Sequence, residues 1–149
     1  MKVAIIHEWL STFGGSERLL VQLLQLFPNA DIFALTHFPN NFQDTELKDL
    51  KVYTTFLQDI PNIEKHYRKL LPIMPLAIES LDVSKYDLVI SLPHAVAHGV
   101  KTHKNQTHIS YISTPMRYAW HMRDDYLKLH GLTHPIVRLA ANGTLSLLR

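Results

Sequence analysis

The opening stretch MKVAIIHEWLSTFGGSERLLVQLLQLFPN, residues 1–29, decides the fold class. Val3–Ile6 places apolar, mostly β-branched residues on consecutive positions, which is typical of a strand buried on both faces of a parallel sheet. A polar loop with Gly14-Gly15 follows, and from Glu17 onward leucines recur at helical spacing. The hydroxyl of Ser16 is expected to cap this helix. The chain therefore opens with a strand, a glycine loop and a helix.

The rest of the chain repeats this alternation of strands and helices. Further strands are predicted at Asp31–Thr36, Val52–Phe56, Tyr86–Ser91 and Thr107–Ile112. Helices are predicted at Ile63–Leu71, after each of the two later strands (the second beginning at Pro115) and at Pro135–Leu148. Pro72 and Pro75 are expected to break the chain and restart a short helix through Ala77, Ile78 and Leu81. This alternation predicts a single α/β domain over residues 1–149 with a mostly parallel sheet. Ligands of such sheets bind at the carboxyl ends of the strands, so the loops after Ile6, Ser91 and Ile112 form the candidate site.

The composition excludes several classes of function. The 149 residues contain no cysteine, which excludes a disulfide scaffold, a thiolate zinc site, an iron–sulfur cluster and a cysteine nucleophile. Fifteen Lys plus Arg against 13 Asp plus Glu give a net charge of +2, too small to indicate a nucleic-acid partner. No window approaches about 18 consecutive apolar residues, and Val3–Ile6 is too short for the core of a signal peptide. We therefore expect a cytoplasmic protein.

The first candidate loop carries Gly14 and Gly15 directly before a helix N-terminus. Glycine lets a backbone approach a ligand closely, and the first-turn amides with the helix dipole favour an anion such as phosphate. The alternative is a tight turn without a ligand, and Glu17 in the first turn would repel a neighbouring phosphate. Neither a Gly-x-Gly-x-x-Gly fingerprint nor a Walker lysine is present, which disfavours a nicotinamide-dependent oxidoreductase.

The second candidate loop, after Ser91, carries His94 and His98 four residues apart. This spacing would place both imidazoles on one helix face, as in some metal sites. No third ligand is nearby in the sequence, which disfavours a metal site. Two roles stay open for His94: contact with a substrate hydroxyl or phosphate, and a capping or surface position.

The third candidate loop contains Ser113, Thr114 and Arg117. Thr114 can cap a helix that begins at Pro115, a residue suited to a first helical turn. Arg117 would then lie in that first turn and can bind phosphate or carboxylate through two parallel hydrogen bonds. A cation there opposes the helix dipole, which weakens a purely structural explanation of Arg117.

A basic segment lies in the middle of the chain. Lys65, Arg68 and Lys69 share one side of the predicted helix Ile63–Leu71. A basic amphipathic helix can lie on an anionic membrane surface. The more frequent arrangement is a solvated face over a core. The three cations thus mark a candidate peripheral contact with the inner face of a membrane.

Taken in order, these segments resemble the amino-terminal half of family-4 glycosyltransferases, which are retaining enzymes of the GT-B fold. The resemblance is strongest to mannosyltransferase-type members that act in bacterial polysaccharide assembly, and it covers the chain from Met1 to about Tyr126. The segments that carry it are His7–Leu10, Gly14–Arg18, Leu71–Glu79, Tyr86–Ser91, His94–Ala97 and Thr114–Trp120.

The resemblance implies a Rossmann-like domain, a mostly parallel sheet with helices on both faces, that forms one half of a GT-B fold. It implies transfer of a sugar, mannose among the candidates, from a nucleotide sugar to a glycan or lipid-linked acceptor, with no metal or other cofactor. Gly14 and Gly15 would approach the donor diphosphate, while His94 and the loop Ser113–Arg117 would line the cleft. Relatives often carry a histidine at the position of Ser113, and a serine cannot act as an imidazole does.

The resemblance also implies a second, donor-binding domain with the paired glutamates of the family, which lies outside these 149 residues. The chain is therefore expected to present the acceptor side of an active site and to be inactive alone, and no catalytic residue is assigned to it. The alternative is a stand-alone sugar-binding, lipid-binding or regulatory module without catalysis.

Overall fold

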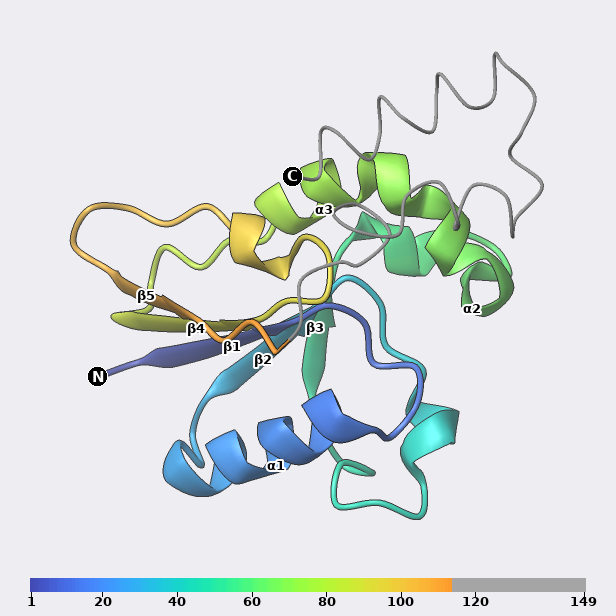
Figure 1. Cartoon of the computed structure of the whole chain (residues 1–149), viewed down its shortest axis with the longest axis horizontal. Helices are drawn as coiled ribbons and strands as arrows, with labels where there is room; N and C mark the ends of the chain where they lie inside the picture. Colours follow the sequence, from blue (N-terminus) through green and yellow to red (C-terminus); the bar gives the residue numbers. More distant parts are fainter. Residues whose placement is uncertain (114–149) are drawn as a thin grey trace.

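The computed structural model describes residues 1–113, and within them five strands form one parallel sheet. The strands are β1 (Val3–His7), β2 (Asp31–Ala34), β3 (Val52–Thr54), β4 (Leu88–Leu92) and β5 (Thr107–Ser110). Their order in the sheet is β3-β2-β1-β4-β5, so the chain winds outward from β1 in both directions (Figure 1). This arrangement confirms the predicted α/β, Rossmann-like fold class.

Helices lie on both faces of the sheet, with α1 (Gly15–Leu26) on one side and α3 (Met74–Glu79) on the other (Figure 1). The remaining helical segments are α2 (Ile63–His66) and the 3-10 turns η1 (Pro39–Phe42), η2 (Phe56–Asp59), η3 (Tyr67–Ile73) and η4 (Ala97–Gly99). All five residues of β1 are buried, as expected of a central parallel strand. Successive side chains of β1 alternate between two apolar layers, Ala4 and Ile6 packing with α3, and Val3 and Ile5 with α1.

The predicted helix Ile63–Leu71 is wrong in its second half. The α-helix ends at His66 and continues as η3, and a new helix, α3, begins at Met74. Pro72 explains the change, because proline has no amide hydrogen and its ring crowds the carbonyl four residues earlier. Pro75 lies in the first turn of α3, where the missing amide hydrogen costs nothing.

The predicted cap of the first helix is also wrong. Gly14, not Ser16, is the N-cap residue of α1. Ser16 lies inside the first turn, where its hydroxyl donates to Glu17 Oε2 over 3.0 Å. The helix starts earlier because the Glu17 carboxylate reaches back and accepts a hydrogen bond from the Gly14 amide. The predicted helices from Pro115 and at Pro135–Leu148 lie outside the described residues.

Candidate functional site

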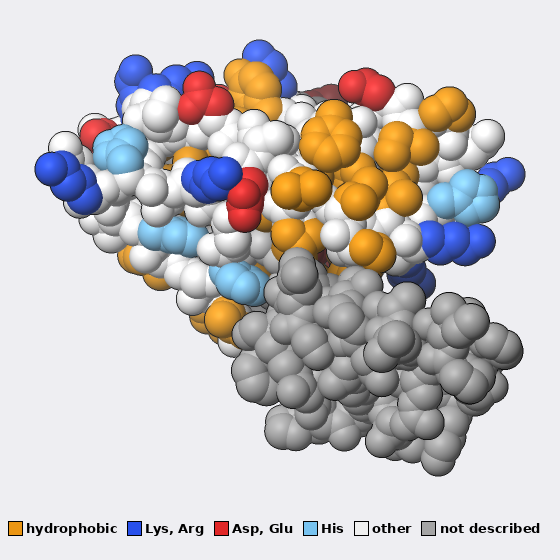
Figure 2. Space-filling view, turned by 90° about the horizontal axis from the view of Figure 1, so that it is seen from above, with side chains coloured by type: hydrophobic (Ala, Val, Ile, Leu, Met, Phe, Trp, Pro, Cys, Tyr) orange, Lys and Arg blue, Asp and Glu red, His pale blue; other side chains and the backbone are white. Residues whose placement is uncertain are grey.

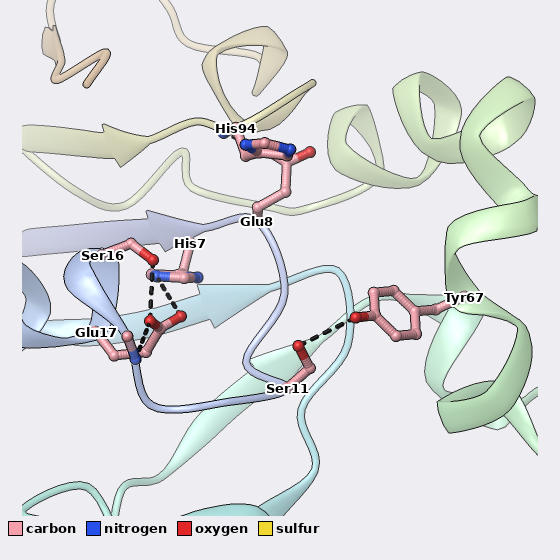
Figure 3. A network of polar contacts seen from close by, with 8 residues as sticks. His7, Glu8, Ser11, Ser16, Glu17, Tyr67 and His94 are labelled. Carbon is pink, nitrogen blue, oxygen red and sulfur yellow. Dashed lines mark hydrogen bonds and ion pairs between the residues drawn. The ribbon is translucent and has the colours of Figure 1, made fainter. Parts of the chain in front are cut away.

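Glu8, the residue that follows β1, joins two of the three candidate loops at the carboxyl edge of the sheet. Its side chain is buried and accepts four hydrogen bonds from backbone amides of the loop after β4. Oε2 accepts from His94, Ala95 and Ala97 over 3.0, 3.1 and 3.0 Å. Oε1 accepts from Val96 over 2.8 Å. Figure 3 shows Glu8 reaching from the end of β1 toward the loop that carries His94.

The four backbone amides form a concave nest of the type that binds anions, and the carboxylate of Glu8 occupies it. Hydrogen bonds to an ionised carboxylate are shorter and stronger than neutral ones, so the loop is held firmly. The helix predicted after β4 is absent, and this segment contains only the short turn η4 (Ala97–Gly99). Glu8 explains the difference, because the N–H groups of this loop donate to its carboxylate and not to the backbone carbonyls that a helix would offer. Sequence reasoning missed Glu8, whose one local signal is an acidic residue directly after a buried strand.

His94 lies in this loop, at the sheet edge where the sequence predicted it, and its side chain is exposed. Its imidazole packs edge-on against the indole of Trp9, with ring centroids 5.5 Å apart. His98, in η4, is also exposed. Within residues 1–113 no group of three His, Asp or Glu side chains is close enough to hold a metal ion. The geometry is compatible with both roles left open for His94, a ligand contact and a surface position.

The glycine loop is shaped by the buried carboxylate of Glu17. The Gly14 amide donates to Glu17 Oε2 over 2.8 Å, so this buried carboxylate caps the N-terminus of α1. The backbone of Gly14 has φ −135° and ψ −151°, which any residue can adopt. A side chain on Gly14 would place its Cβ 3.3 Å from Glu17 Oε2, whereas a Cβ on Gly15 would meet no atom within 4 Å. Gly15 is therefore the glycine that leaves open space for a ligand at the helix N-terminus.

His7, at the end of β1, is buried beside this carboxylate. Its Nε2 lies 3.5 Å from Glu17 Oε1 (Figure 3). Burial lowers the pKa of His7 below its ordinary value of 6.5, although the carboxylates of Glu17 and Glu8 act in the opposite direction. The imidazole is therefore neutral at pH 7, and the contact between His7 and Glu17 is not an ion pair there. Sequence reasoning missed His7, because it appears as the polar end of an apolar strand.

The third loop is described only at its start. Ser113 is exposed and follows β5, which neighbours β4 at the edge of the described sheet. The other predicted residues of this loop, Thr114 and Arg117, lie outside the described residues.

A chain of contacts connects the basic segment with the candidate site. The Tyr67 hydroxyl donates to Ser11 Oγ over 3.1 Å (Figure 3). Arg68 Nε donates to the Tyr67 hydroxyl oxygen, also over 3.1 Å. The Tyr67 ring also packs edge-on against Trp9, with centroids 5.4 Å apart. The segment that begins with α2 is thus attached to the loop after β1 and, through Trp9, lies near His94.

Comparison of the chain with family models, with curated proteins and with solved structures finds no match. The class of the protein is therefore defined by its fold alone, an α/β, Rossmann-like domain with a parallel sheet. In the part of the chain that the structure describes, no helix is long and apolar enough to cross a bilayer.

Proposed function

We propose that this chain is the acceptor-side domain of a GT-B retaining glycosyltransferase. It takes part in moving a sugar, mannose among the candidates, from a nucleotide sugar to a glycan or lipid-linked acceptor. The observation that supports this proposal is the junction at Glu8, whose carboxylate joins the loops after β1 and β4. Both loops carry segments of the family resemblance, and both lie where parallel sheets bind ligands.

The roles of the residues follow from their positions. Gly15 leaves the backbone at the N-terminus of α1 open to a diphosphate, whose charge the helix dipole favours and the capping carboxylate of Glu17 opposes. His94 presents an exposed imidazole to the acceptor or to a phosphate oxygen. Ser113, Thr114 and Arg117 follow the neighbouring strand and would supply further donors to the substrate. As the family resemblance implies, the proposed reaction uses no metal ion.

Exposed apolar residues at the strand ends favour this proposal over a stand-alone binding module. Tyr111 and Ile112 follow β5 directly and are each 55% exposed. Phe56 follows β3 closely and is 49% exposed. A stand-alone module is expected to close this edge with polar side chains, whereas a domain that docks against a second one leaves apolar side chains there. A second domain would complete the cleft and stabilise the departing nucleotide diphosphate.

Ligand titration of the isotope-labelled full chain tests the assigned roles. Millimolar GDP-mannose or UDP-glucose is expected to shift the amide resonances of Gly14, Gly15 and Ser16 more than inorganic phosphate does. His94→Ala is expected to weaken binding of the nucleotide sugar or of an acceptor glycan, while the free energy of unfolding changes by less than about 0.5 kcal/mol because the side chain is exposed. Absence of shifts from both loops would refute the assignment, and unfolding of His94→Ala would make that residue structural.

The intact mass of the protein from its native source tests the need for a second domain. The proposal expects a mass well above 17.2 kDa, or co-purification with a separate donor-binding protein. Sugar transfer by the 149-residue chain alone, at the rate of an intact enzyme, would contradict the proposal.

A further inference from the structure

The segment from α2 to α3 presents apolar side chains to the surface. Leu76 is 65% exposed and Ile73 is 37% exposed, and Pro72 within η3 is exposed as well. We call these three residues, with the half-buried Leu71 and Pro75, the apolar patch. Figure 2 shows hydrophobic side chains gathered on this face, in the region of η3 and α3, with Lys and Arg side chains beside them toward α2.

The core does not require the exposed members of this patch. Met74, Ala77 and Ile78 of the same segment are buried in the core layer, and Tyr67 is buried in a smaller cluster with Phe38 and Ile63. A single exposed leucine is ordinary in a folded protein, but adjacent exposed apolar residues are typical of a surface that binds a protein or a membrane.

The basic residues predicted from the sequence lie beside the patch. Lys65, Arg68 and Lys69 are all exposed. Of the acidic residues in the same segment, Glu79 pairs with Lys101 over 2.9 Å, whereas Glu64 accepts a hydrogen bond from the neutral Asn41 amide and keeps its charge, so three cations stand against one anion. The surface therefore combines apolar side chains with a positively charged flank.

We propose that this surface docks on an anionic lipid bilayer. Leu76 and Ile73 enter the headgroup region, and Lys65, Arg68 and Lys69 contact the lipid phosphates. The apolar patch alone would equally fit a protein partner or a second copy of the chain. The basic flank of Lys65, Arg68 and Lys69 favours the bilayer, because its positive charge complements an anionic lipid surface and would repel the same flank of a second copy.

The docked orientation has a consequence for the site that rests on the proposed function. Tyr67, beneath the basic flank, contacts both Ser11 and Trp9 of the loop after β1. His94 packs against the same Trp9. Docking through the patch would therefore bring the acceptor-side loops close to the bilayer surface, where the headgroup of a lipid-linked acceptor is found.

Vesicle flotation with the full chain tests this proposal. The vesicles are phosphatidylcholine, with or without phosphatidylglycerol, at low and at high salt. We expect binding only to the phosphatidylglycerol vesicles, and a marked loss at high salt because the Debye length shortens. Lys65→Gln with Lys69→Gln is expected to weaken binding about thirtyfold. Leu76→Ser is expected to weaken it about tenfold.

Matched controls lie elsewhere on the molecule. Lys48→Gln with Lys104→Gln removes the same charge from other exposed positions, and Leu26→Ser removes a 71% exposed leucine from α1, on the other face of the sheet. Both control variants are expected to bind vesicles as the unchanged chain does.

Three outcomes would overturn the proposal: no flotation with anionic vesicles at low salt, equal losses in test and control variants, or a dimer that Leu76→Ser dissociates. Vesicle binding needs no nucleotide sugar, so failure of the proposed function would leave this result unchanged.

Discussion

A single carboxylate, that of Glu8, holds four backbone amides of a loop that lies 86 to 89 residues further along the chain. Glu8→Gln would keep the shape of the side chain but leave one oxygen to accept these bonds, and its amide hydrogens would face the N–H groups of the loop. We expect a loss of about 3 kcal/mol in the free energy of unfolding, measured by urea denaturation. Glu46→Gln, at an exposed position, is the control and should change stability by less than about 0.5 kcal/mol.

The pH dependence of stability should report the burial of His7. Its pKa in the folded chain is lowered, so below about pH 6.5 the unfolded chain binds more protons than the folded one. The contribution of His7 is therefore fully present above about pH 6.5 and is lost as the pH falls through the folded-state pKa, by up to about 1.4 kcal/mol per pH unit.

The measurement is urea unfolding of the unchanged chain and of His7→Gln between pH 7.5 and pH 5. His37 and His108, whose pKa values are also lowered by burial, titrate in both proteins, so the difference in slope belongs to His7. Equal slopes would mean that the imidazole is not kept neutral. If His7→Gln does not fold, the nitrogen chemical shifts of the His7 ring in the unchanged chain report directly whether the imidazole is neutral.

At the scale of elements, the two glycines before α1 should behave differently. Gly15→Ala is expected to keep or raise stability, by up to about 1 kcal/mol, because alanine favours the helix and its Cβ meets no atom. Gly14→Ala is expected to destabilise by about 0.5–1 kcal/mol, because the added Cβ displaces the carboxylate of Glu17 and alanine is a poor N-cap. Thermal unfolding compares the two. The reverse order would show that the cap does not depend on Glu17.

The elements that could be predicted from the sequence are those fixed by local patterns. The buried strands β1 and β4 were readable because apolar residues occupy consecutive positions, and α1 because its leucines have helical spacing. The loop after β4 could not be predicted, because the partner of its amides is Glu8, which no nearby pattern indicates. The loops after β1 and β4 lie at the carboxyl edge of the sheet, as expected, but Glu8, whose carboxylate joins them, was missed.

For the whole molecule, the sheet order explains why two distant segments of sequence meet. β1 lies in the middle, pairing with β2 through Ala4–His7 and with β4 through Val3–His7. The loops that follow β1 and β4 are therefore neighbours, although more than 80 residues separate them. The junction at Glu8 joins these two loops at the carboxyl edge of the sheet, and the basic flank of the apolar patch is attached to the loop after β1 through Tyr67.

The central position of β1 also has a consequence for folding during synthesis of the chain. β1 leaves the ribosome before both of its partners and can pair with β2 early, but its other edge stays unpaired until β4, which ends at Leu92, has been made. Until then the nascent chain carries an apolar strand with an open edge, and such edges recruit other chains. A chain truncated before Leu92 would therefore be prone to aggregate, and a chaperone that shields β1 during synthesis would raise the yield of folded protein.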